Sequence, residues 1–261
     1  MLNWLRQLFG RRSTRPGTIP DALWQATLAA CPFLAARPAA ELLQLRGLAS
    51  EFLAHKEFTG AHGLVVTDEM AVAIAAQACL PVLHLGLGWY DDFVGIVVHP
   101  GQMLARRERL DEAGVMHRYS EVLAGEAMDR GPVTLSWQDV ASAGSLAGHG
   151  YNVVIHEFVH KIDMKDGAAD GCPPLPSRAA YAAWREVMQT AYDSFREQVS
   201  MAERFGGEAP WLDAYGATAP AEFFAVTCEA YFVNRERFTR DFPALTRLYD
   251  QFFKVNSPSA L

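Results

Sequence analysis

The residues best able to do chemistry lie at positions 156–160, where the sequence reads His-Glu-Phe-Val-His. Two imidazoles four residues apart with a carboxylate beside the first form the H-E-x-x-H pattern. On an α-helix these imidazoles share one face, so both can bind one cation about 2.0–2.1 Å from each ring nitrogen. Glu157 lies about 100° around the helix, where it can take a proton from a water on that cation. We predict that His156 and His160 are metal ligands and that Glu157 is a general base.

The alternative is an ordinary buried polar cluster. Apolar residues at 153–155, 158–159 and 162 surround most of the helix, which indicates packing on several sides. Two histidines and a glutamate in such a helix are costly unless they have partners. A metal satisfies both imidazoles at once, whereas a purely structural cluster needs three separate buried hydrogen-bond partners that the sequence does not identify. The pattern therefore favours a metal site.

Zinc is the expected metal, because imidazole and carboxylate ligands suit it and no thiolate-rich cluster competes. A catalytic site needs a third protein ligand, and three acids are candidates. Asp166 stands ten residues after His156, the distance found in short-spaced metallopeptidases, but those carry Gly where this chain has Asp163. Glu222 and Glu229 are the other two candidates, and the residues alone leave the choice open.

Glu222 and Glu229 belong to a second predicted helix. Thr218 is a possible cap and Pro220 is tolerated in a first turn, so we predict a helix from this point to about Val233. Glu222 then lies near the helix start, with Glu229 seven residues later and near the same face. The alternative role for Glu222 is a first-turn acid that interacts favourably with the helix dipole, worth about 0.3–1 kcal/mol.

Three stretches of the chain together resemble the Mlc titration factor A family of zinc metallopeptidases. They read His-Glu-Phe-Val-His-Lys-Ile-Asp at 156–163, Asp-Ala-Tyr-Gly-Ala-Thr-Ala-Pro-Ala-Glu-Phe-Phe-Ala-Val at 213–226, and Leu-Pro-Val-Leu-His-Leu-Gly-Leu-Gly-Trp at 80–89. The likeness runs from about Leu80 to Phe253, and more weakly from about Pro20. The zinc motif alone fits many metallopeptidases, whereas the three blocks are specific in combination.

The resemblance implies a cytoplasmic peptidase with one Zn²⁺ per chain. The family's ligands match His156, His160 and Glu222, and its catalytic carboxylate matches Glu157. The resemblance also points to Tyr215, seven residues before Glu222, whose phenol could donate a hydrogen bond to the oxyanion of a hydrolysed amide. The alternative for Tyr215 is a half-buried tyrosine whose hydroxyl meets any polar partner.

Two functions from different classes follow from this resemblance. The first is hydrolysis of a peptide substrate, for which the family implies aminopeptidase activity, although no acidic anchor for a free amine is identifiable in the sequence. The second is binding of a transcriptional repressor of the Mlc type, which would affect sugar-uptake regulation. A non-catalytic anti-repressor with a structural or regulatory zinc site is therefore the alternative to an enzyme.

Composition sets the remaining limits. With 261 residues, 50% of them hydrophobic, the chain can bury the core of one domain, which we expect to be two-lobed and to span residues 20–261. Residues 1–19 read as a flexible basic arm with four arginines and no acid. A net charge of −7 argues against direct nucleic-acid binding, and no apolar run has the length of a membrane span. The four widely spaced cysteines indicate reduced, mostly buried thiols.

The elements that must position the site can also be predicted. The fold class is α+β, a mostly helical zincin-like metallopeptidase domain with a small mixed β-sheet beside the H-E-x-x-H helix. Gly101 to Gly131, rich in Arg and Glu, reads as a solvated excursion around that sheet, and Lys165 to Ser177 as a loop. The further predicted helices and strands are helices at 21–29, 38–56, 67–79 and 178–204, and strands at 93–99 and 133–136.

Overall fold

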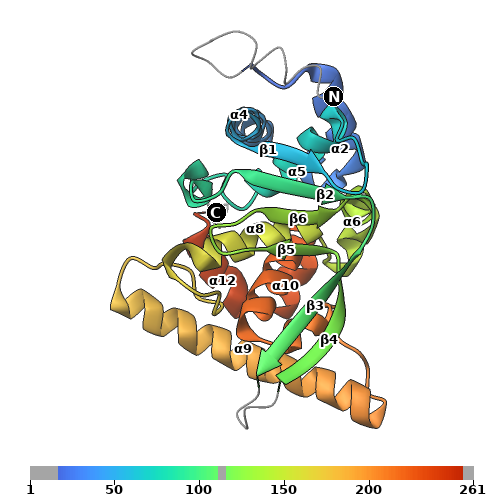
Figure 1. The fold of residues 1–261 in the computed structure, drawn as a ribbon. Helices are drawn as coiled ribbons and strands as arrows, with labels where there is room; N and C mark the ends of the chain where they lie inside the picture. The colour runs from blue at the N-terminus through green and yellow to red at the C-terminus, as the bar shows by residue number, and fades with distance from the viewer. Residues whose placement is uncertain (1–16, 111–115, 255–261) are drawn as a thin grey trace, which may run out of the picture.

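A four-stranded mixed sheet lies beside the helices of the domain (Figure 1). The computed structural model describes residues 17–110 and 116–254, and at 104–110 and 116–122 it describes the backbone alone. The strand order is β1-β2-β6-β5; the first three strands run parallel, and β5 pairs antiparallel with β6 at the edge. The register pairs Ile96 with Val133 and Gly125 with Leu135. The strands are β1 (Glu57–Gly60), β2 (Gly95–His99), β5 (Gly125–Ala127) and β6 (Val133–Ser136).

The helices pack around a central helix, α8, which contacts α5, α10, β5 and β6. In Figure 1, α2, α4 and α5 lie at one end of the domain, and α9, α10 and α12 lie at the other. The predicted mostly helical α+β class with a small mixed sheet is confirmed. The α-helices are α2 (Asp21–Ala30), α3 (Pro32–Ala35), α4 (Ala39–His55), α5 (Asp68–Cys79), α6 (Trp137–Ala141), α7 (Ala143–Leu146), α8 (Val153–Asp163), α9 (Arg178–Phe205), α10 (Pro220–Val233), α11 (Arg235–Asp241) and α12 (Pro243–Phe252).

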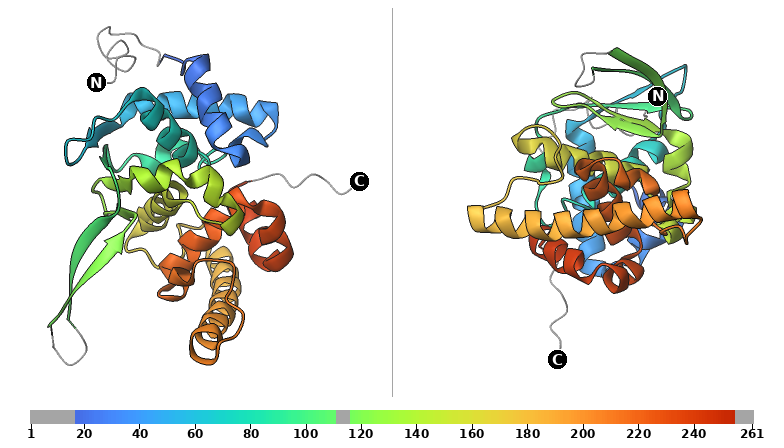
Figure 2. Two further views of the ribbon diagram at one scale, coloured as in Figure 1. Left: turned by 90° about the vertical axis from the view of Figure 1, so that its right-hand side faces the viewer. Right: turned by 90° about the horizontal axis from the view of Figure 1, so that it is seen from below.

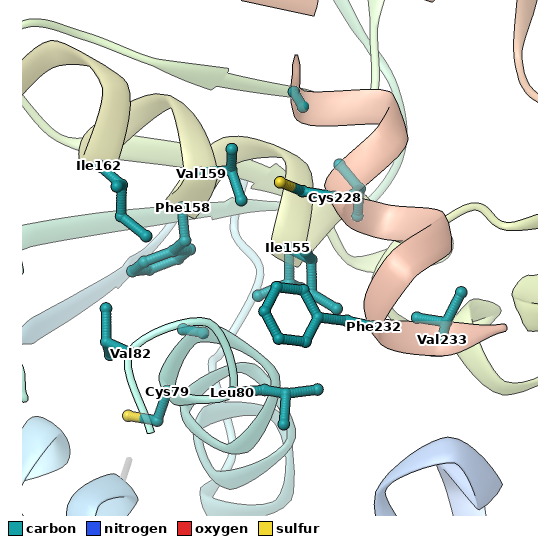
Figure 3. Packing of buried hydrophobic residues seen from close by; sticks show 14 of the residues in the cluster. Cys79, Leu80, Val82, Ile155, Phe158, Val159, Ile162, Cys228, Phe232 and Val233 are labelled. Carbon is teal, nitrogen blue, oxygen red and sulfur yellow. The ribbon is translucent and has the colours of Figure 1, made fainter. Parts of the chain in front are cut away.

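The central helix α8 forms where the apolar pattern predicts it. Asn152 caps its start, because its Oδ1 accepts from Ile155 N at 2.9 Å. The Nδ2 of the same side chain donates to Gln77 Oε1 in α5 at 2.7 Å. Figure 3 shows its apolar side chains between the end of α5 and the side chains of α10. Phe158 is fully buried there, and burial of a side chain of this size stabilises the fold by about 1.5–3 kcal/mol. The helix carrying the motif is thus held from several directions.

The stretch from Gly101 to Gly131 corrects the predicted excursion. It contains a two-stranded antiparallel sheet of β3 (Met103–Leu110) and β4 (Met116–Leu123), followed by β5 of the main sheet. The prediction was wrong because strand pairing rests on main-chain hydrogen bonds and cross-strand neighbours, which a charged composition does not exclude. Figure 2 shows this hairpin extending away from the helices.

The N-terminal end of the described chain is part of the core. Ile19 is fully buried, its amide donates to Ser50 Oγ at 3.1 Å, and its carbonyl accepts from Arg46 Nε at 3.1 Å. Packing therefore begins one residue before the predicted domain start. Residues 1–16 of the predicted basic arm lie outside the described residues.

The state of the cysteines and the length of the apolar helices were also predicted from the sequence. Cys31, Cys79, Cys172 and Cys228 are all buried and free, as predicted. Among the helices of the described part of the chain, none has both the length and the apolar character that crossing a bilayer requires.

Candidate metal centre

Helices α8 and α10 bring three potential metal ligands together. Glu222 Oε2 lies 3.1 Å from His156 Nε2 and 3.2 Å from His160 Nε2, and the two Nε2 atoms are 3.2 Å apart. Around a tetrahedral zinc ion with bonds of 2.0–2.1 Å, ligand atoms are separated by about 3.3 Å. The three residues therefore fit a single divalent ion with little movement, and among the described residues they form the group that could hold one.

Helix α10 begins where it must for Glu222 to reach the histidines. Pro220 occupies the first helical position, and Glu222 lies in the first turn. The predicted cap, Thr218, is wrong: the extended residue before the helix is Ala219, which has no capping side chain. Thr218 directly follows the preceding 3-10 turn with helical backbone angles, and its hydroxyl donates to the Tyr215 carbonyl at 2.7 Å. The helix start therefore depends on Pro220.

Glu229 lies two turns further along α10 and contacts the other side of His156. Its Oε1 is 2.7 Å from His156 Nδ1, and its Oε2 accepts from the amide of Asn152, at the start of α8. A carboxylate on the second ring nitrogen fixes the tautomer and orientation of a histidine ligand. Glu229 is thus an orienting residue, a role that the sequence analysis missed although the seven-residue spacing from Glu222 contained the signal.

Asp166, the remaining candidate for third ligand, lies away from the cluster. Asp163 keeps helical backbone angles, so α8 continues into a short 3-10 turn, η3 (Met164–Asp166), on which Asp166 is exposed to solvent. The sharp turn that brings a third ligand back in short-spaced metallopeptidases does not form. Asp163 itself is buried: its Oδ2 accepts from Gly171 N at 2.8 Å, and burial raises its pKa to about 7.

The neighbouring charges favour a cation at the cluster. Burial alone would lower the pKa of His156, but the Glu229 and Glu222 carboxylates outweigh burial and raise it well above its ordinary value. Burial also opposes ionisation of Glu222, yet hydrogen bonds with His156 and His160 hold its pKa well below the usual range. The carboxylates therefore stabilise positive charge at the imidazoles, whether a proton or a metal ion supplies it.

Glu157 lies beside the ligands on the wall of a cavity of about 600 Å³. Its side chain is buried, with a relative exposure of 5%, and burial raises its pKa to about 7 despite the two histidines, which act to lower it. The cavity is also lined by the three potential ligands and by β5. A carboxyl group with this pKa, next to a cation site, can exchange protons near neutral pH.

Tyr215 lies across the cavity on the 3-10 turn η4 (Ala214–Ala217). Its ring centroid is 6.2 Å from that of His156, and the residue is 37% exposed. The Asp213 carboxylate accepts from its amide at 2.9 Å and so helps to shape the turn. The five residues predicted for the site, His156, Glu157, His160, Tyr215 and Glu222, all line this one cavity.

The fold and the site together define a metallopeptidase-like protein: a helix with two histidines and an acid, a third carboxylate from a second helix, and an edge strand bordering the cavity. Residues 4–254 match the model of the family described as glucose-regulated metallo-peptidase M90, and the chain belongs to that family.

Relatives named Mlc titration factor A match most of the chain. The protein of Serratia proteamaculans is 37% identical over 234 residues, which are 89% of this chain and 87% of the relative. The Salmonella arizonae protein is 35% identical over 92% of this chain and 94% of its own length, and the Yersinia pestis protein is 32% identical over 97% and 90%. The family resemblance noted in the sequence is thus confirmed.

Proposed function

We propose that this protein is a zinc-dependent peptidase in which His156, His160 and Glu222 bind Zn²⁺ and Glu157 is the general base. The observation that carries the proposal is the convergence of two Nε2 atoms and one carboxylate oxygen beside a buried carboxyl group in a single cavity. Two histidines and one carboxylate are the protein ligands of many catalytic zinc sites. Membership of a metallo-peptidase family supports the same chemistry.

The chain's own residues divide the work of amide hydrolysis. When bound, zinc acts as a Lewis acid that lowers the pKa of a water molecule toward about 7 and polarises the substrate carbonyl. Glu157 accepts the proton of the attacking water and passes it to the departing amine. Tyr215, across the cavity, donates its phenol hydrogen to the oxygen that becomes negative.

The edge strand β5 is the surface on which we expect the peptide substrate to bind. One side of β5 pairs with β6, and residues 123–127 line the cavity. An extended peptide can add to such an edge through main-chain hydrogen bonds, which holds the scissile amide near Glu157 without requiring a particular side chain. Whether the free amine of the substrate is also bound, as in an aminopeptidase, is testable with paired peptides that carry free or acetylated N-termini.

The variant Glu157→Gln tests the proposed base. We expect it to fold and to bind one zinc per chain, but to hydrolyse peptides about 10²–10⁴-fold more slowly, because an amide cannot accept the proton. Glu186→Gln, an identical exchange on the exposed face of α9, is the matched control and should hydrolyse at the parental rate. Parental hydrolysis by Glu157→Gln would show that the base is misassigned.

The relatives' name favours a second function, the binding of a transcriptional repressor of the Mlc type. In this proposal the protein is cytoplasmic and acts on the repressor without contacting nucleic acid itself. Binding of purified repressor should be measured for wild type, for Glu157→Gln and for zinc-depleted protein. Binding that survives both changes favours a non-catalytic anti-repressor. Binding that requires zinc would mean that repressor binding and peptide hydrolysis depend on the same metal site.

A further inference from the structure

Gly125, the first residue of β5, lies directly against the side chain of Glu157. A Cβ atom built on Gly125 would be 2.5 Å from Glu157 Oε1, 2.6 Å from its Cγ and 2.7 Å from its Cδ. Atoms that are not bonded to each other do not approach so closely, so any side chain at position 125 would occupy the space of the Glu157 side chain. The approach of β5 to α8 therefore depends on glycine at this position.

The strand is not free to move away from an added methyl group. β5 pairs with β6, where Gly125 is opposite the fully buried Leu135. The turn after β5 is tied to α8 as well, because Lys161 Nζ donates to the carbonyls of Met128 at 2.6 Å and Gly131 at 2.9 Å. β5 is thus held by β6 along its length and its following turn is tied to α8, so the Glu157 side chain would have to yield.

Packing is also what holds Glu157 in place. In the part of the chain that the structure describes, no residue makes a hydrogen bond to its carboxylate, whereas Glu222 and Glu229 are each fixed by such bonds. We propose that Gly125 is a positioning residue: its missing side chain leaves the space in which the Glu157 carboxylate sits beside the metal ligands. The catalytic part of this inference rests on the proposed function, but the steric part does not.

A stability cycle tests the contact without any reference to activity. We expect Gly125→Ala to lower the Tm of zinc-free protein by about 2–10 °C, because the added methyl overpacks the site. In the background of Glu157→Ala the same exchange should cost little, since the space is then open. An equal loss of Tm in both backgrounds would overturn the proposal, and the double variant gives an answer even if Gly125→Ala alone folds poorly.

An activity cycle then tests the positioning role. Gly125→Ala should retain one zinc per chain and a near-parental KM, while kcat falls about 100-fold, as expected for a displaced catalytic group. The double variant Gly125→Ala with Glu157→Gln should be no slower than Glu157→Gln alone, because both changes act through one carboxylate. Losses that multiply, or a loss confined to KM, would overturn the role assigned to Gly125.

Gly95→Ala in β2 is the matched control, because its Cβ would have Pro132 Cβ as its nearest neighbour at 3.4 Å, an ordinary contact. It should leave kcat, KM and zinc content unchanged. If wild-type protein hydrolyses no peptide, the proposed function fails, and the stability cycle still decides whether Gly125 sets the place of Glu157.

Discussion

The exchange Glu229→Gln should weaken metal binding although Glu229 touches no metal. The side chain is buried, with a relative exposure of 1%, and each of its oxygens accepts one hydrogen bond. Those bonds come from His156 Nδ1 and from the amide of Asn152. Glutamine has the same shape but offers one oxygen and one NH2 group, so it can accept only one of the two bonds. One donor is then left facing another donor inside the protein.

The size of the effect can be worked out from these two bonds. If the glutamine oxygen turns to the amide of Asn152, the glutamine NH2 group faces His156 Nδ1. It then favours the tautomer of His156 that carries its proton on Nε2, and a protonated Nε2 cannot bind a metal. Loss of such an orienting partner typically costs 10–100-fold in metal affinity, or about 1.4–2.7 kcal/mol. If the oxygen instead stays on His156, an unpaired amide at the start of α8 costs about 1–3 kcal/mol of folding stability.

Zinc affinity should be measured by competition with a chelator of known affinity, and unfolding by chemical denaturation of zinc-free protein. Glu186→Gln, exposed on α9, is the control and should match wild type in both. Glu222→Gln should lose zinc more completely than Glu229→Gln, because it removes a ligand. Parental zinc affinity and parental stability in Glu229→Gln would refute the orienting role, and a greater zinc loss than in Glu222→Gln would reverse the two assignments.

The remaining predictions concern the phenol, the pH profile, the metal and the strand. Tyr215→Phe should lower kcat about 10²–10³-fold with zinc content unchanged, and a parental kcat would remove Tyr215 from the mechanism. Burial raises the pKa of Glu157 to about 7, so the base becomes protonated below this pH and kcat/KM should fall toward acid. The midpoint should lie at or below pH 7, because a bound cation favours the ionised carboxylate. A kcat/KM profile that is flat through the acid range would contradict this. Zinc at about 100 times its Kd should stabilise the fold by about 2.7 kcal/mol and raise Tm by roughly 5–10 °C, a shift that a chelator reverses and that would be missing without a site. Lys161→Met removes the donor of the Gly131 carbonyl and leaves the Met128 carbonyl with the Gly131 amide alone. Denaturation should show a loss of about 1–3 kcal/mol that is absent from Lys165→Met.

Local pattern was enough to predict the elements that carry the site. The apolar residues around the motif predicted α8, the helix predicted at 178–204 matches α9, and Pro220 predicted the start of α10. The hairpin of β3 and β4 was missed, because charged strands show no apolar alternation and are held by pairing between main chains. The sequence also did not show that Ala219, and not Thr218, precedes α10. Thr218 has helical backbone angles because it directly follows the 3-10 turn.

Within the site, the sequence determined the relative positions of residues that lie on one helix. Residues four apart share a face whatever surrounds them, so His156 and His160 were predictable as a pair, with Glu157 turned away from them. Tertiary structure decided which distant acid joins them: α10 packs against α8 in a register that puts Glu222 at both Nε2 atoms and Glu229 behind His156. It also decided that Gly125 meets Glu157, since contacts between segments distant in sequence depend on how whole elements pack, and no local periodicity encodes that packing.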